Sequence, residues 1–380
     1  MKGRRIATCW AMLAIAVLGM TAISGTSSAH LPMYSPGGST MSTALKIPDA
    51  NTSYGITAEF PSSTNRIQFY AFSVYAGQDL SFELDVPATS SLQDFAPVIL
   101  LIGPGLHSPD SNTSRIIDEF SITLSSGDGA TIYLYNGTEN VRVFEPFTQT
   151  NLWVRQSGEV TLPSTGIYYL AVAVPQGWPH DATSGFGKYI LAPGTVERFT
   201  LLDYMSIPID WVKWHAFWGQ SVLLLMVPTF LVVVIGVTGT WYYLKNRRPE
   251  MLESKPSVTR TGFYLGAVGA MLMVGSTVNQ MALLFYYTRF SLETADYIEL
   301  MLQVIGLVLG ILAFRMVFGL MQPRSTARKV LSIALLVLIG FAALMVGAGW
   351  LVGPVLFACA GLTELLSANR TERRTDALER

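Results

Sequence analysis

Histidine is the residue type whose placement first suggests chemistry, because the chain has only four histidines and three of them precede its hydrophobic half. If a leader is removed after Ala29, His30 becomes the first residue, and its free amine and ring nitrogen can bind copper together. A second histidine completes the arrangement known as a histidine brace, and His107 and His180 are available in the same half of the chain. Met33 can add a soft ligand. These residues predict a copper site as one interpretation.

The competing interpretation is that His30 is an incidental residue beside a processing site. Signal peptidases accept many residues after the cut, and a lone histidine in a loop is usually solvated. His215 lies among tryptophans, which favours an aromatic segment at the membrane surface over a ligand site. Apart from copper, no cofactor is expected.

The sequence carries no familiar catalytic motif. It has no GxSxG, no HExxH, no P-loop, and no histidine and cysteine paired as a nucleophile and base. Cys9 lies in the leader and Cys359 in a late apolar run, so a disulfide between them is excluded in a processed chain. We therefore expect no enzyme activity and no nucleic-acid partner.

The composition is that of a hybrid between an exported domain and a membrane protein. Half of the 380 residues are hydrophobic and 13% are charged, and the mean hydropathy is +0.39. The net charge of -1 hides an uneven distribution, since residues 30–205 contain sixteen Asp or Glu against seven Lys or Arg. The first half is therefore acidic.

Residues 1–29 have the features of a signal peptide. Lys2, Arg4 and Arg5 precede an apolar run over 6–23, and small residues end at Ala29, which predicts cleavage between Ala29 and His30. The apolar run, at roughly 18 residues, is also long enough to remain as an uncleaved anchor. Both alternatives place the following segment outside the cytoplasm.

Residues 30–200 predict an extracytoplasmic β-sandwich. Short runs of β-branched and aromatic residues alternate with Gly, Pro, Asn and Asp turns, as in an all-β, antiparallel sandwich of the jelly-roll or immunoglobulin-like kind. The clearest predicted strands are 66–74, 80–86, 96–102, 130–136, 166–174 and 187–193.

The order of these segments resembles the prepeptidase C-terminal (PPC) type of β-sandwich. In that family a tyrosine-containing strand leads into an "aGq" turn, matched here by Ala76, Gly77 and Gln78, and a late "GxYyl.V" strand is matched by residues 166–172. The resemblance covers about half of the chain and implies an accessory, carbohydrate-contacting or stabilising module without catalytic residues. The whole layout also resembles uncharacterised archaeal and bacterial membrane proteins, which implies no activity.

Three sequons lie in the same half, at Asn51, Asn112 and Asn136. They are candidate glycosylation sites if the host glycosylates exported proteins.

The second half predicts a helical membrane domain. An interfacial aromatic helix at 201–218, with Trp211, Trp214 and Trp218, joins the halves and is expected to rest on the outer membrane face. Residues 219–367 then predict five spanning helices, with 351–367 separated from its predecessor by a turn in GAGWLVGP. The five helices are expected at about 219–244, 261–288, 299–321, 330–348 and 351–367.

The basic segments set the predicted orientation. Residues 245–260, 322–329 and the tail 368–380 are rich in Lys and Arg, whereas 289–299 is acidic. Basic segments prefer the cytoplasm, so five helices place all three basic segments inside and the sandwich outside. The prediction is a multi-pass protein of the cell membrane with a cytoplasmic C-terminus.

Few polar residues fall inside the predicted spans. Arg315 is the one charge within a helix, close enough to the inner face to reach the headgroups. Asn279, Gln280 and Gln303 are expected to form interhelical hydrogen bonds. Glycine pairs with four-residue spacing predict tight helix packing, within one chain or between copies: Gly262 with Gly266, Gly306 with Gly310, and Gly349 with Gly353.

The leading hypothesis is a non-enzymatic integral membrane protein that displays an acidic sandwich for binding or complex assembly. Its expected partners are the lipid bilayer and other membrane proteins or cell-surface components. The alternatives are an extracytoplasmic copper-handling protein that uses His30, and a small-solute permease, which would need a continuous polar route through its helices.

Overall fold

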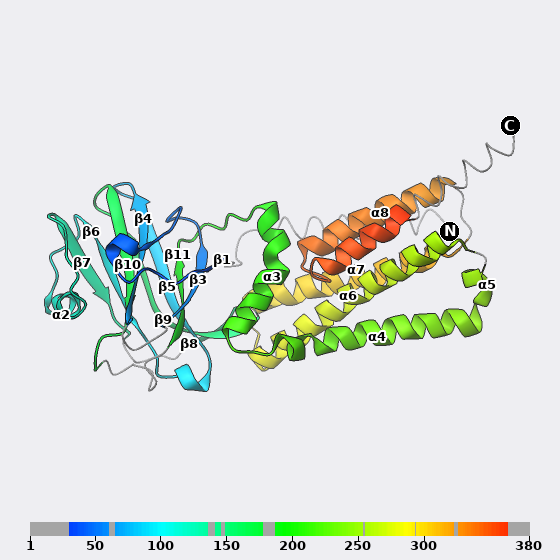
Figure 1. The fold of residues 1–380 in the computed structure, drawn as a ribbon, viewed down its shortest axis with the longest axis horizontal. Helices are drawn as coiled ribbons and strands as arrows, with labels where there is room; N and C mark the ends of the chain where they lie inside the picture. The colour runs from blue at the N-terminus through cyan, green and yellow to red at the C-terminus, as the bar shows by residue number, and fades with distance from the viewer. Residues whose placement is uncertain are drawn as a thin grey trace. The chain divides into compact units, whose positions relative to one another are not determined.

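The computed structural model describes residues 30–60, 65–135, 141–145, 149–177, 187–253, 255–292, 294–322 and 326–363. The chain divides into two compact units, and the boundary that falls among these residues is between Thr200 and Leu201. The first unit consists of two mostly antiparallel sheets and the second consists of helices (Figure 1). The predicted fold class, a β-sandwich followed by a helical bundle, is confirmed.

Among its described residues, the sandwich contains eleven strands, a nine-residue helix and two short 3-10 helices. They are β1 (Leu31–Tyr34), η1 (Met41–Thr43), β2 (Leu45–Lys46), β3 (Tyr54–Glu59), β4 (Ile67–Val74), β5 (Asp79–Pro87), η2 (Ser90–Leu92), β6 (Val98–Pro104), α2 (Ser111–Glu119), β7 (Asp128–Tyr133), β8 (Val141–Glu145), β9 (Thr150–Thr161), β10 (Gly166–Ala173) and β11 (Lys188–Pro193). One sheet has the order β1-β3-β11-β5-β9-β8 and the other β2-β4-β10-β6-β7. β1 pairs with β3 and β2 with β4 in parallel, and the remaining pairs are antiparallel.

The sandwich core follows the alternation of side chains along the strands. In β10, Tyr168 and Leu170 are fully buried between the two sheets, whereas Ala171 belongs to a second apolar cluster on the opposite side of its sheet. Ile116 of α2 joins that second cluster, so α2 closes over the outer side of the five-stranded sheet (Figure 1). The five-stranded sheet is therefore apolar on both faces.

A hydrogen-bonded tyrosine pair lies inside the sandwich core. The hydroxyls of Tyr70 and Tyr189 are 2.8 Å apart, and Tyr189 donates to Oε1 of Gln68 at 2.7 Å. Because these buried polar atoms satisfy one another, they link β4 of one sheet to β11 of the other instead of destabilising the core.

The helical unit contains a junction helix followed by a bundle. The helices are α3 (Leu201–Phe217), α4 (Val222–Arg247), α5 (Pro249–Glu253), α6 (Ser257–Thr288), α7 (Thr294–Leu320), α8 (Thr326–Met345) and a final helix, Val352–Thr363. Three of them are long and apolar enough to cross a membrane: α4, α6 and residues Asp296–Leu320 of α7. The apolar parts of α8 and the final helix, Leu331–Met345 and Val352–Thr363, are shorter. The five-span topology remains a prediction.

A tight turn separates α8 from the final helix. Gly347, Gly349 and Trp350 all have positive φ values, of 68°, 76° and 49°, which glycine adopts easily and tryptophan rarely. The amide of Gly349 donates to the hydroxyl of Ser276 in α6 at 2.6 Å. The hydroxyl of Ser276 therefore supplies a hydrogen-bond partner for a backbone amide that the turn leaves without a partner in a helix.

The glycines of α6 pack inside the chain. A methyl group placed on Gly269 would lie 2.7 Å from the carbonyl oxygen of Gly353 and 3.1 Å from the amide nitrogen of Phe357. A methyl group on Gly266 would lie 2.6 Å from Val317 of α7. The glycine pairs were expected to pack helices closely, either within one chain or between copies. In the structure, Gly266 and Gly353 make such contacts within one chain.

We expect Gly269→Ala to lower the stability of the helical unit by about 1–3 kcal/mol, because the new methyl group would push against rigid backbone. Gly239→Ala is the matched control, since nothing lies within 4 Å of the added carbon and alanine favours a helix by up to about 1 kcal/mol. Thermal unfolding in detergent measures both variants. Equal stability of the two variants would contradict this packing.

Candidate functional site

His30 lies at an edge of the sandwich, directly before β1. Its Nδ1 is 2.6 Å from the hydroxyl of Ser53, and burial lowers the pKa of its ring to about 4. The ring is therefore neutral near pH 7, which is the form that binds metals. The leader residue Ala29 lies outside the described residues.

The other predicted copper ligands are placed differently. His107 is exposed, and its carbonyl accepts a hydrogen bond from Ala130 of β7 at 3.1 Å. The ring of Tyr133 in β7 meets Phe82 of β5 at 4.8 Å, which places β7 over the part of the other sheet that is distant from β1. The structure thus does not bring His30 and His107 together.

His180 lies outside the described residues, so its pairing with His30 stays a prediction. Met33 is partly buried against the sandwich core. Within the described part of the chain, no group of three or more His, Cys, Asp or Glu side chains is arranged to hold a metal ion.

The sequons differ in accessibility. The side-chain oxygen of Asn51 accepts a hydrogen bond from Gln78 at 3.0 Å, whereas Asn112 is exposed in the first turn of α2. Asn136 falls outside the part of the chain that the structure describes. Of the two that can be compared, Asn112 is the more accessible to a bulky sugar.

The most perturbed acidic group of the sandwich is Asp85, on the side of β5 that faces away from the sheet-sheet core. It is only 3% exposed, and its Oδ1 has no hydrogen-bond partner among the described residues. Burial raises the pKa of Asp85 well above its ordinary value, and the nearby carboxylates of Glu83 and Glu145 raise it further. Burial also raises the pKa of Glu83.

Arg155 of β9 is a buried cation that fixes the segment around η2. Its guanidinium donates to the carbonyl of Gln93 at 2.6 Å and to that of Leu92 at 3.2 Å. It also lies over the rings of Tyr135 and Trp153, at 5.1 and 5.0 Å from their centroids. These contacts give the positive charge of Arg155 a structural role.

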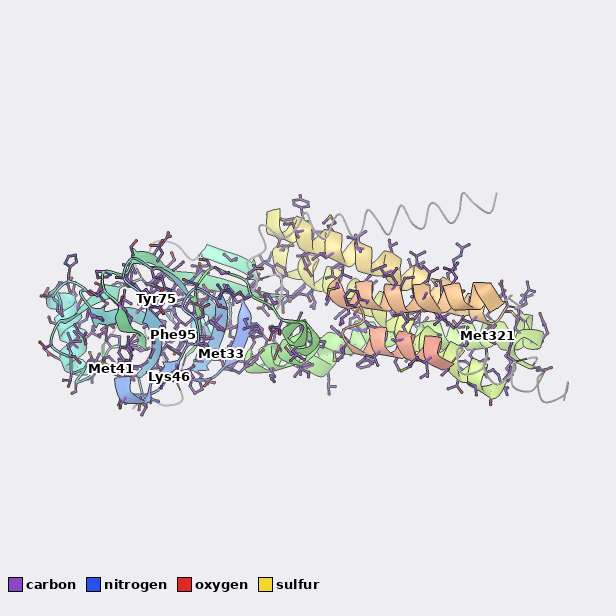
Figure 2. The ribbon with its side chains drawn as sticks, turned by 90° about the horizontal axis from the view of Figure 1, so that it is seen from above. Met33, Met41, Lys46, Tyr75, Phe95 and Met321 are labelled. Atoms are coloured by element: carbon purple, nitrogen blue, oxygen red, sulfur yellow. The ribbon has the colours of Figure 1, made fainter. Side chains whose placement is uncertain are left out.

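Two large apolar side chains are exposed together on the outer side of the five-stranded sheet. Ile167 is 55% exposed and pairs with Ser73 across β10 and β4. Tyr75, two residues after Ser73, is 77% exposed, and Figure 2 labels it. Because residues two apart along a strand point to the same face, we expect Tyr75, one residue beyond the end of β4, to lie diagonally next to Ile167 on that face. We call these two residues the exposed pair.

The aromatic residues of α3 are buried within the helical unit. Trp211 and Trp214 are 4% and 5% exposed, and the Trp211 ring lies 4.1 Å from His215 and 6.0 Å from Trp350. This differs from the expected belt of membrane-facing aromatics, because Trp350, from the turn after α8, packs against α3. The composition of α3 contained no signal for that distant contact.

His215 belongs to a hydrogen-bonded chain that ties α3 to α6. Its Nδ1 donates to the side-chain oxygen of Gln220, and Gln220 donates to the hydroxyl of Tyr287 at 3.0 Å. His215 is fully buried. The ring is therefore used to fix the junction helix on the bundle.

The polar residues predicted inside the spans are buried near one end of the bundle. Asn279 and Gln303 are 2% and 3% exposed, and Gln303 donates to Glu299 at 2.6 Å. Nδ2 of Asn279 and Oε1 of Gln280 have no hydrogen-bond partner among the described residues. Among the described residues, no hydrogen bond between helices is found for Asn279, Gln280 or Gln303, although such bonds were predicted.

Sequence reasoning missed the buried carboxylates and Arg155. Glu83 and Asp85 stand at alternate positions of a strand, which ordinarily indicates a solvated face, so the local sequence gave no sign of their burial.

No protein-family model and no curated protein matches this chain.

We expect Asp85→Asn to stabilise the sandwich near neutral pH by about 1 kcal/mol, because the amide replaces a carboxyl group whose charged form burial disfavours and which must therefore take up a proton on folding. The folded state holds a proton on Asp85 at pH values where the unfolded state has released it. The contribution of Asp85 to folding stability therefore falls as pH rises from the ordinary pKa of a carboxyl group in the unfolded chain to the raised pKa in the folded state. The variant should show a flatter dependence of melting temperature on pH above about 4.

Asp118→Asn, on the exposed side of α2, is the matched control. Identical pH profiles for wild type and Asp85→Asn, measured by thermal unfolding of the full chain in detergent, would show that Asp85 is an ordinary surface carboxylate.

Proposed function

We propose that this chain is a non-enzymatic, multi-pass protein of the cell membrane that displays its acidic sandwich outside for binding or complex assembly. Within the described part of the chain, three helices long and apolar enough to span a membrane support the membrane location. The Lys and Arg residues of 245–260 and 322–329 favour a cytoplasmic position for those loops, and with it an extracytoplasmic sandwich.

The exposed pair is the observation that carries the binding role. Tyr75 and Ile167 leave a large apolar area on a face that α2 covers elsewhere. An aromatic and an aliphatic side chain side by side are typical anchors of a protein interface. The surrounding domain is acidic, with sixteen acidic against seven basic residues over 30–205, so a partner with basic residues around an apolar centre fits best.

The helical unit supports a holding role better than a permease. Its core includes the large apolar side chains of Phe263, Met273 and Phe357, all fully buried. Buried polar side chains such as Ser276, Asn279 and Gln303 gather in one part of the bundle. A packed apolar core over the other part does not provide the continuous polar route that a permease needs.

The proposal predicts that the double substitution Tyr75→Ser with Ile167→Thr reduces binding of the partner without unfolding the domain. Crosslinking in native membranes, followed by affinity purification and mass spectrometry, measures the recovered partner. We expect recovery to fall by at least about tenfold, as for loss of an interface anchor worth about 2 kcal/mol. Val143→Thr, an exposed apolar residue on the other sheet, is the control.

Unchanged recovery with the double variant would remove the exposed pair from the binding role. Turnover of a hydrolase or redox substrate that depends on an exported side chain would contradict the non-enzymatic function itself.

A further inference from the structure

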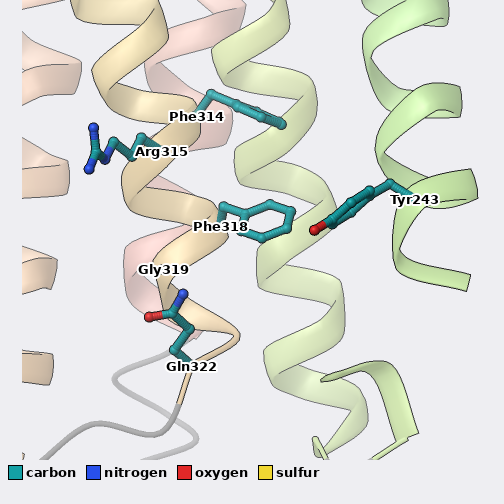
Figure 3. Close-up of a pocket in the computed structure, with 6 residues that line it drawn as sticks. All are labelled: Tyr243, Phe314, Arg315, Phe318, Gly319 and Gln322. Carbon is teal, nitrogen blue, oxygen red and sulfur yellow. The ribbon is translucent and has the colours of Figure 1, made fainter. Parts of the chain in front are cut away.

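A groove with a volume of about 600 Å³ lies between α4 and α7. It is lined by Tyr243 of α4, by Phe314, Arg315, Phe318 and Gly319 of α7, and by Gln322, which follows the end of α7 (Figure 3). Arg315 extends from the side of α7 that faces away from α4, and Gln322 lies just beyond the end of α7, whereas the two phenylalanines extend toward the side of α4 (Figure 3). The lining is therefore polar on one side and aromatic on the other.

Arg315 brings a permanent positive charge to this groove. It is exposed, and no ion pair found between described residues involves it. It is also the only charged residue between Gln303 and Gln322. A guanidinium in an apolar helix is costly unless it meets an anion or the headgroup layer.

The neighbouring end of α4 indicates the depth of the groove. Trp241, Tyr242 and Tyr243 are 44%, 63% and 44% exposed, and Lys245 follows with its Nζ 4.8 Å from the centre of the Trp241 ring. Exposed aromatic residues followed by basic residues are typical of the boundary between hydrocarbon and headgroups. Since Tyr243 lines the groove, the groove opens at that boundary.

We propose that this groove binds the headgroup phosphate of an anionic phospholipid. The Arg315 guanidinium pairs with phosphate oxygens through two parallel N–H groups. The Gln322 amide lines the same groove and supplies a further donor. Phe314 and Phe318 provide an apolar surface for the first part of an acyl chain. Lys245 adds positive charge that favours an anionic over a zwitterionic lipid.

The test compares lipid retention by wild type, Arg315→Gln and the matched control Arg289→Gln, which removes an exposed arginine near the other end of α6. Each full-length protein is purified in detergent, exchanged into a mixture of phosphatidylglycerol and phosphatidylcholine, and examined by native mass spectrometry. We expect wild type and Arg289→Gln to retain phosphatidylglycerol. Arg315→Gln should retain about tenfold less, as expected for loss of a charge-assisted hydrogen bond.

Two further measurements distinguish the source of the phosphate and the state of the variant. Inorganic phosphate at millimolar concentration should leave phosphatidylglycerol bound, and its displacement would overturn the lipid as the occupant. Arg315→Lys should keep part of the retention, because it keeps the charge but loses the paired donors. Equal retention of both lipids by wild type, or equal loss in Arg289→Gln, would overturn the site.

Discussion

The close approach of helix backbones along α6 is the constraint on which the helical unit depends. Apolar helices gain little from hydrophobicity when their surroundings are equally apolar, so short contacts and hydrogen bonds must hold them together. Gly266 and Gly269 have no side chain at the positions where α7 and the final helix cross α6, so the helices can approach closely. Ser276 then donates its hydroxyl to Met273 of its own helix and accepts the amide of Gly349. One helix thus supplies both the space and the polar partner for the turn after α8.

The turn that α6 holds in place also positions the junction helix. Trp350 packs against Trp211, and the chain from His215 through Gln220 to Tyr287 fixes the end of α3 on α6. The buried polar groups of the sandwich serve a similar purpose, as Arg155 fixes the segment around η2. Polar side chains of this kind specify one arrangement more than they contribute net stability. The surface features left over are the exposed pair and the groove at Arg315.

The sequence predicted the elements with strong local patterns. The alternating runs of β4, β5 and β10 and the apolar lengths of α4 and α6 are visible without tertiary information. β9 was not among the predicted strands, because TNLWVRQSGEVT mixes Arg155 and Glu159 with polar residues and hides its alternation. α2 was missed because only a few apolar residues of SNTSRIIDE, such as Ile116, reach the sheet.

The candidate sites were less predictable because they depend on contacts between residues distant in sequence. His30 could be named from its position, yet its distance from His107 depends on the order of strands in two sheets. The burial of Asp85 and the contact of Trp211 with Trp350 likewise arise only when the chain is folded. Arg315 was identified as an unusual charge, whereas the groove beside it required the neighbouring position of Tyr243.

The central claim, a sandwich displayed outside on a bundle with basic loops inside, is tested most directly by labelling in intact cells. Single cysteines at Ser108, in the sandwich, and at Ser257, at the start of α6, are introduced into a background with Cys9→Ser and Cys359→Ser, and both positions are exposed. A membrane-impermeant maleimide should label Ser108→Cys in intact cells and Ser257→Cys only after permeabilisation. Labelling of Ser257→Cys in intact cells, with protection of Ser108→Cys, would contradict the account.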